Sequence, residues 1–140
     1  MRLRLFSALA LLSLCYAFCF AATPSEDDNA ALHADMAWLH LIDTGDLQAA
    51  WNNAAKVMQS VLPEPQFASS IGGARNPLGS PGGRELLHVQ DATTLPGAPD
   101  GHYVIAQYQT DFANKPHAVE TIVASQESDG SWHVAGYFIR

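Results

Sequence analysis

Cysteine, basic side chains and long apolar segments are scarce in this sequence of 140 residues. The two cysteines, Cys15 and Cys19, both lie within residues 1–22, so the rest of the chain cannot form a disulfide framework, a cysteine nucleophile or a thiolate metal site. The same segment holds two of the seven basic residues. The remaining five stand against fourteen Asp and Glu residues, which gives residues 23–140 a formal charge of −9. Phosphates repel such an acidic chain, so nucleic acid is excluded as a partner.

Residues 1–22 have the organisation of a signal peptide. Arg2 and Arg4 precede an apolar stretch from Leu5 to Phe20, and small residues follow at the expected cleavage position near Ala21. An apolar run of this length is short for a bilayer span, which takes about 20 residues. No second run of that length follows. We therefore predict cleavage and release as a periplasmic or secreted protein, without stable membrane insertion.

A helix is predicted after a polar, flexible lead-in at residues 23–29. Ser25 and Asp28 have the spacing of a helix-capping pair. From about residue 30 the apolar side chains recur with helical spacing, and Asp35 is expected at the edge of the apolar face. Gly45 has the place of a residue that ends a helix.

A second helix is predicted from Asp46, the residue expected to cap it, to Val61. Pro63 ends this pattern, and only a short turn is expected between residues 66 and 71. Residues 72–83 contain five glycines and two prolines. They are predicted to form a long loop, and such loops tend to be functional or disordered.

After this loop the hydrophobic period changes to two. Strands are predicted over residues 84–91, 102–112, 117–127 and 132–139, with a hairpin turn at Asp129-Gly130. On the second strand the even-numbered positions are the apolar ones, and Asp111 falls on the polar face. Helices followed by an antiparallel meander predict a single α+β domain over residues 30–140, with N-terminal helices packed on a curved sheet of about four strands.

Several spaced motifs resemble one bacterial family. They are Trp-Leu-x-Leu-Ile-Asp-x-Gly at 38–45, Arg-Asn-Pro-Leu-Gly at 75–79, Leu-Pro-Gly at 95–97, Gln-Tyr-x-Thr-Asp-Phe-x-Asn-Lys at 107–115 and Asp-Gly-x-Trp-x-Val-Ala-Gly-Tyr at 129–137. Over about residues 29–139 the chain resembles the small exported proteins described as domain of unknown function 4019. The resemblance implies a cone-like α+β fold, similar to cystatins or to nuclear transport factor 2. It implies no activity and no catalytic residue.

Cone folds of this kind can hold a cavity between the helices and the concave side of the sheet. Six aromatic side chains are candidates for lining it: Trp38, Trp51, Tyr103, Tyr108, Trp132 and Tyr137. Two interpretations stay open, a ligand pocket or a filled core. The core is favoured, because a domain of this size buries such side chains whether or not it binds a ligand.

Three polar residues are candidates for recognition or catalysis. Arg75 and Arg84 flank the Gly/Pro-rich segment, and Arg75 is expected to hold it through hydrogen bonds to a carboxylate at a helix or strand end; recognition of an anion or a partner protein is the alternative. Asp111 has the chemistry of a general base, but an Asp at a strand end more often accepts hydrogen bonds from the following turn. Six histidines are scattered, and the two on the first helix are seven residues apart, too far to share a metal ion. No metal or cofactor is expected.

Three classes of function remain. The first is an exported, non-enzymatic protein that binds another protein, with an immunity-type inhibitor of a basic toxin as a specific version, since opposite charges accelerate encounter. The second is a carrier of a small apolar ligand in the cavity, and the third is an isomerase-like enzyme there, with Asp111 or a histidine as the base. No catalytic constellation stands out in the sequence. A binding protein, monomeric or homodimeric, therefore ranks first.

Overall fold

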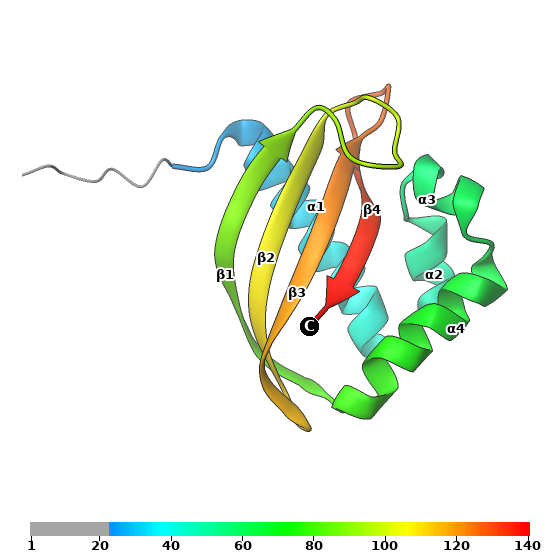
Figure 1. Cartoon of the computed structure of the whole chain (residues 1–140), viewed down its shortest axis with the longest axis vertical. Helices are drawn as coiled ribbons and strands as arrows, with labels where there is room; N and C mark the ends of the chain where they lie inside the picture. Colours follow the sequence, from blue (N-terminus) through cyan, green and yellow to red (C-terminus); the bar gives the residue numbers. More distant parts are fainter. Residues whose placement is uncertain (1–22) are drawn as a thin grey trace, which may run out of the picture.

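The computed structural model describes residues 23–140, so the predicted signal peptide and both cysteines lie outside the described residues. In chain order the elements are α1 (Glu26–Thr44), α2 (Leu47–Asn52), α3 (Lys56–Val61), α4 (Glu64–Arg75), a 3₁₀ turn (Asn76–Leu78), β1 (Pro81–Ala92), β2 (Tyr103–Phe112), β3 (Lys115–Gln126) and β4 (Trp132–Ile139). The strands form one antiparallel sheet in the order β1-β2-β3-β4. Helix α1 crosses one face of this sheet, and α2 to α4 lie beyond β4 (Figure 1). The predicted α+β fold, with its helices N-terminal to the sheet, is confirmed.

Helix α1 begins at the predicted capping pair. The Ser25 hydroxyl accepts a hydrogen bond from the backbone N–H of Asp28 at 3.0 Å, and the Asp28 carboxylate accepts one from the Ser25 N–H at 2.7 Å. The flexible lead-in predicted at residues 23–29 is therefore too long, because the helix starts at Glu26. Gly45 ends the helix in the left-handed conformation, at φ 79°, as predicted. No helix among residues 23–140 is long and apolar enough to cross a membrane.

The single helix predicted from Asp46 to Val61 is wrong. Asp46 caps α2 as expected, since its carboxylate accepts a hydrogen bond from the N–H of Ala49 at 3.1 Å. The helix then stops at Asn52 and resumes as α3, because the chain between them pairs with β4. Ala54 forms a parallel bridge with Val134, and the Ala55 N–H donates to the Val134 carbonyl at 2.8 Å.

The loop predicted at residues 72–83 is also wrong. Gly72 and Gly73 belong to α4, a helix of 12 residues that includes the short turn predicted at 66–71, and β1 begins already at Pro81. Phe67 and Ile71, one turn apart, are buried against the rest of the core. This burial outweighs the weak helix propensity of the two glycines.

The register of the sheet places even-numbered residues of β2 and β3 on the side of α1. Ala106 is opposite Ile122 and Tyr108 is opposite Glu120, and all four are buried. The parity predicted for β2 is confirmed, and Asp111 is exposed. This face of the sheet is the one that α1 covers, so the core lies between them.

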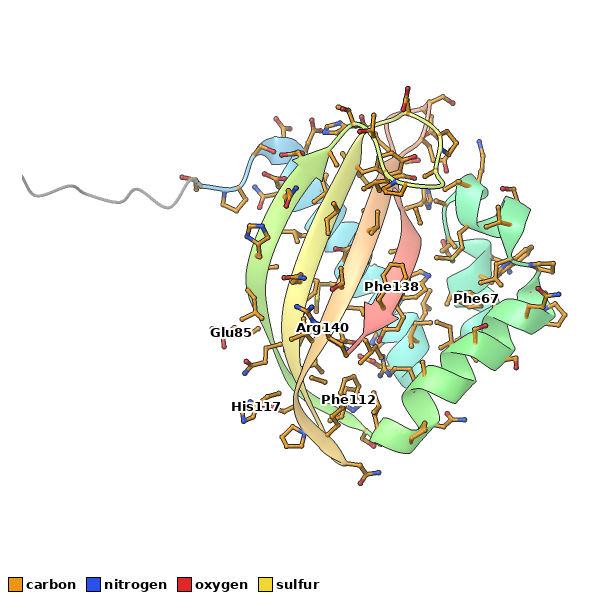
Figure 2. All side chains as sticks on the ribbon, viewed as in Figure 1. Phe67, Glu85, Phe112, His117, Phe138 and Arg140 are labelled. Atoms are coloured by element: carbon orange, nitrogen blue, oxygen red, sulfur yellow. The ribbon has the colours of Figure 1, made fainter. Side chains whose placement is uncertain are left out.

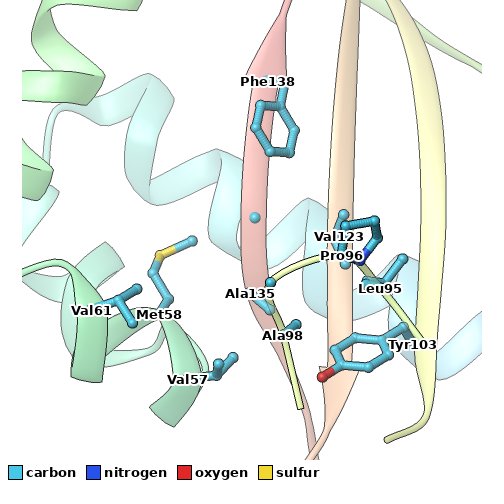
Figure 3. A pocket seen from close by; sticks show the side chains of 12 residues that line it. Val57, Met58, Val61, Leu95, Pro96, Ala98, Tyr103, Val123, Ala135 and Phe138 are labelled. Carbon is cyan, nitrogen blue, oxygen red and sulfur yellow. The ribbon is translucent and has the colours of Figure 1, made fainter. Parts of the chain in front are cut away.

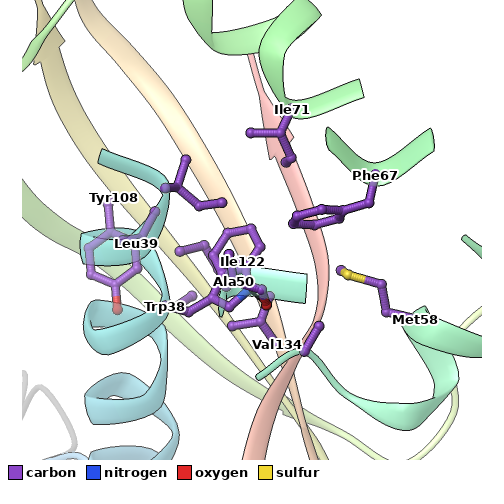
Figure 4. Packing of buried hydrophobic residues seen from close by; sticks show 12 residues of the cluster. Trp38, Leu39, Ala50, Met58, Phe67, Ile71, Tyr108, Ile122 and Val134 are labelled. Carbon is purple, nitrogen blue, oxygen red and sulfur yellow. Dashed lines mark hydrogen bonds between the residues drawn. The ribbon is translucent and has the colours of Figure 1, made fainter. Parts of the chain in front are cut away.

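The core between helices and sheet is filled by side chains (Figure 4). The indole of Trp38 packs edge-on against Phe67, with ring centroids 6.1 Å apart, and its N–H donates to the Ala50 carbonyl at 2.9 Å. Leu39 and Ile122 are fully buried beside it. These contacts join α1, α2, α4 and β3 into one core.

Candidate functional site

Four charged side chains from four different elements meet beside this core. Asp43 at the end of α1 accepts hydrogen bonds from Arg75 at the end of α4 (2.5 Å) and from Arg84 on β1 (3.0 Å). The same two guanidinium groups contact Glu120 on β3, Arg84 at 2.6 Å and Arg75 at 3.4 Å. Two positive and two negative charges therefore compensate one another. We call these four residues the buried ion cluster.

Glu120 is the centre of the buried ion cluster. It is 0% exposed, and its carboxylate also accepts hydrogen bonds from the hydroxyls of Thr110 (2.5 Å) and Tyr137. Burial raises the pKa of the Tyr137 hydroxyl, and the neighbouring Glu120 charge raises it further. Burial alone would lower the pKa of Arg84, but its two carboxylate partners outweigh this effect and raise it. The charged form of Arg84 and the neutral form of Tyr137 are thus the stable ones.

The buried ion cluster is suited to holding elements together. Burial raises the pKa of Asp43, but the two arginines outweigh it and hold this pKa below its ordinary value. The guanidinium of Arg75 also lies over the ring of Phe112, 4.7 Å from its centre. All four carboxylate oxygens accept hydrogen bonds from the arginines, so neither carboxylate is free to take a proton from a substrate. The cluster fixes α1, α4, β1 and β3 relative to one another.

A separate buried carboxyl lies on α1. Asp35 is 0% exposed, and one of its oxygens accepts a hydrogen bond from the Tyr108 hydroxyl at 3.3 Å while the other has no partner among the described residues. Burial raises the pKa of Asp35 from 3.8 to about 7, against the opposite effect of the Tyr108 hydrogen bond. The edge position predicted for Asp35 is wrong, because it shares a helix face with the buried residues Ala31, Trp38 and Leu39.

The six aromatic candidates do not line a common cavity. Tyr103 borders one pocket, Tyr137 a second, and Trp38 with Trp132 a third. Tyr108 is buried against Asp35, and the indole N–H of Trp51 donates to the Leu62 carbonyl at 2.9 Å. The cavity expected between helices and sheet is occupied by core side chains, which separates the aromatic residues.

The structure brings together two of the three polar candidates, Arg75 and Arg84, but not Asp111. Arg75 and Arg84 meet in the buried ion cluster, with Arg75 held by a helix-end carboxylate as expected, although it belongs to α4 and not to a loop. Asp111 points away from both, its side chain 53% exposed, and accepts a hydrogen bond from the His117 N–H at 2.8 Å. Within residues 23–140, no three His, Cys, Asp or Glu side chains gather in a group that could hold a metal ion.

An apolar groove lies between α3, α4 and the edge strand β4. Its first part, about 360 Å³, is lined by α3, the loop after β1 and the sheet (Figure 3). Its second part, about 260 Å³, lies between α4 and the last residues of β4. Both parts share Met58, Val61, Ala135, Gly136 and Phe138. We call the two parts together the β4 groove.

Two large apolar side chains at the β4 groove face solvent. Val61 is 75% exposed and Phe138 is 65% exposed, the highest values among the large hydrophobic residues described. Figure 2 labels Phe138 on β4. Single exposed apolar residues are common on protein surfaces. Here, in contrast, they border continuous apolar pockets, which is typical of a binding surface.

The surface around the β4 groove belongs to a strongly acidic molecule. Two of the five basic residues in 23–140 are enclosed in the buried ion cluster, together with two of the fourteen acids. Of the other three, Lys56 lies 3.8 Å from Glu127, and Lys115 and Arg140 are exposed. The exposed surface therefore carries a large excess of carboxylates.

Sequence reasoning missed Glu120 and the β4 groove. Glu120 shares strand parity with Ala118 and Ile122, which marks it as an inward-facing charge and could have identified it. The groove left no such signal, since Val61 continues the apolar spacing of the predicted helix, which predicts a buried side chain, whereas the structure exposes it.

The fold and these two features define a single-sheet α+β protein with a largely buried charged cluster inside and an open apolar groove beside its edge strand. A family model described as Protein of unknown function (DUF4019) matches residues 34–137. The chain belongs to this family, and the resemblance found in its motifs is confirmed. Searches of curated proteins and of solved structures found no significant match. The likeness to cystatins and nuclear transport factor 2 stays a prediction.

Proposed function

We propose that the protein is an exported, non-enzymatic binding module that contacts another protein through the β4 groove. The observation that carries this proposal is the pair of exposed side chains, Val61 and Phe138, at the border of two joined apolar pockets. Export is supported by the charged and apolar organisation of residues 1–22. The acidic surface favours a basic partner, as in an immunity-type inhibitor of a toxin.

The alternatives have less support. An isomerase-like enzyme needs titratable groups that face a shared cavity, whereas Glu120 and Asp43 are bound by arginines and Asp111 points to solvent. A carrier of a small apolar ligand has one favourable observation, the volume of about 360 Å³ in the first part of the groove. Native mass spectrometry of the protein from its exported fraction tests it, since a carrier retains extra mass of a few hundred daltons, whereas a binding module shows the bare chain.

A photo-crosslinking residue at position 138 tests the proposed function. Leu87 is the matched control, because it is an apolar side chain, 51% exposed, on the strand at the opposite edge of the sheet. We expect a discrete crosslinked protein from position 138 and none from position 87. The partner identified by the crosslink is then purified, and its affinity is measured for the native protein and for the variant Val61→Ser. We expect the variant to bind it more weakly. Equal crosslinking from both positions, or unchanged binding by Val61→Ser, would contradict the proposal.

A further inference from the structure

The outer edge of β4 has unused backbone groups. Val119 and Arg140 exchange both of their backbone hydrogen bonds, at 2.9 and 3.1 Å. In an antiparallel ladder such reciprocal pairs recur at every second residue, so Phe138 also bonds to β3. The N–H and C=O groups of Tyr137 and Ile139 consequently point away from β3, toward the side of the β4 groove.

The chain itself already pairs with the other end of this edge. The Ala55 N–H donates to the Val134 carbonyl at 2.8 Å, and Ala54 forms a parallel bridge with Val134. The chain then leaves the sheet to form α3, so this pairing stops after one bridge. An added strand along residues 136–139 would continue the pairing that residues 54–55 begin.

The two parts of the β4 groove fit the geometry of a strand. They lie on either side of Phe138, with Val123 and Tyr103 lining the first part and Phe67 and Ile71 lining the second. Successive side chains of a strand point to opposite sides. Two neighbouring apolar residues of an added strand would therefore enter different parts of the groove, which is how proteins that add a peptide strand obtain specificity.

The net charge of the surface favours a basic segment as the added strand. The loop after β1 and the turn after β3 carry Asp100 and Asp129, and α4 begins with Glu64. Two basic residues also lie at the bordering elements, Lys56, which is paired with Glu127, and Arg140 after the end of β4. Acidic residues nevertheless outnumber basic ones over the exposed surface as a whole. Lys or Arg residues on either side of an apolar core would complement it.

We infer that the partner binds as an added strand on the outer edge of β4, through an extended segment of a basic protein in which apolar residues are flanked by Lys or Arg. The inference rests on the proposed function and specifies the partner and the way it docks.

The probe is a synthetic peptide with the sequence KKVLVLKK, used with ¹⁵N-labelled protein. Amide hydrogen exchange is followed residue by residue with and without the peptide. The amides of Tyr137 and Ile139 should exchange fast in the free protein and slowly in the complex. The Phe138 amide bonds to β3 in both states, so it should exchange slowly throughout and reports that the sheet is intact. Two control peptides, KKSSSSKK and EEVLVLEE, keep only the charge or only the apolar core and should bind more weakly.

Two variants of Ile139 distinguish the contribution of its backbone N–H to peptide binding from that of its side chain. Ile139→Pro removes the outward N–H without touching a bond to β3, and proline is tolerated at such edge positions. Ile139→Ala keeps the N–H and shortens the side chain. We expect Ile139→Pro to weaken peptide binding about tenfold relative to Ile139→Ala, the equivalent of one backbone hydrogen bond. Leu87→Ser, on the other edge strand, should leave the affinity unchanged.

The outcomes distinguish the two proposals. Protection of Tyr137 and Ile139 together with a specific loss in Ile139→Pro supports strand addition. If the peptide perturbs groove residues but leaves both amides unprotected, strand addition is wrong while the proposed function stands. Failure of the peptide to bind also overturns the inference, whereas the crosslink from position 138 tests the function independently. If the two amides become protected with rising protein concentration alone, and a dimer mass appears, the occupant is a second copy of this chain and the inference is again wrong.

Discussion

Replacing Asp35 by asparagine should change how stability depends on pH. Asp35 is fully buried on α1, and burial raises its pKa from 3.8 to about 7. A carboxyl that holds its proton more tightly in the folded than in the unfolded chain destabilises the fold as the proton is lost. Its contribution is therefore most favourable below about pH 4, worsens between pH 4 and 7, and is constant above that range.

The size of the effect follows from the shift. The pKa of Asp35 rises by roughly three, and each pKa unit is equivalent to about 1.4 kcal/mol. The unfolding free energy should therefore fall by about 4 kcal/mol between pH 4 and 8. The asparagine side chain of the variant has no such titration. One polar atom of its amide takes the place of the Asp35 oxygen that has no hydrogen-bond partner. Such an unpaired buried group lowers the unfolding free energy by about 1–3 kcal/mol at every pH. That constant cost cancels when the two pH profiles are compared.

The assay is urea unfolding of residues 23–140 at pH values from 4 to 8, followed by tryptophan fluorescence. We expect Asp35→Asn to gain about 4 kcal/mol relative to the native sequence across this range. Asp27→Asn, at an exposed position of the same helix, is the control. If the profiles of the native sequence and Asp35→Asn run parallel, the argument that burial perturbs this carboxyl is refuted.

Three further substitutions test the packing by urea unfolding at pH 7. Glu120→Gln leaves two buried guanidinium groups without a full counter-charge and should lower the unfolding free energy by about 3–5 kcal/mol. A decrease of only about 0–1 kcal/mol, as for an exposed ion pair, would show that water reaches the cluster. Phe67→Ala should cost about 3–5 kcal/mol, because the ring is 1% exposed in the core, and a loss near zero would mean that α4 is not anchored there. Gly82→Ala brings a methyl group to 2.9 Å from a backbone oxygen of β2 and should cost about 1–3 kcal/mol, whereas Gly83→Ala meets nothing within 4 Å; equal effects would contradict this geometry.

The strands were predictable because their signals are local. Alternation of apolar and polar residues and the Asp129-Gly130 turn locate β2 to β4 within two residues of their observed bounds. The helix interruption was not predictable, since it depends on the bond between Ala55 and Val134, which are distant in sequence. A local pattern cannot contain that information.

The candidate site was predictable in type but not in detail. The positive charge of Arg75 predicts a carboxylate partner, but the chain contains fourteen Asp and Glu residues. Only the tertiary fold, which brings α1 and β3 to the end of α4, selects Asp43 and Glu120 as its partners. The β4 groove is an arrangement of three elements around an edge, so no single segment encodes it.

The interruption between α2 and α3 has a consequence for how copies of the chain behave toward one another. An edge strand with unpaired backbone groups is a template for association with identical chains. A continuous helix from Asp46 to Val61 would leave this edge of β4 without the cover that residues 54–55 provide at Val134. The broken helix shortens the available edge to the few residues beside the groove. A sequence change that restored the helix would lengthen that edge and favour aggregation between copies of the chain.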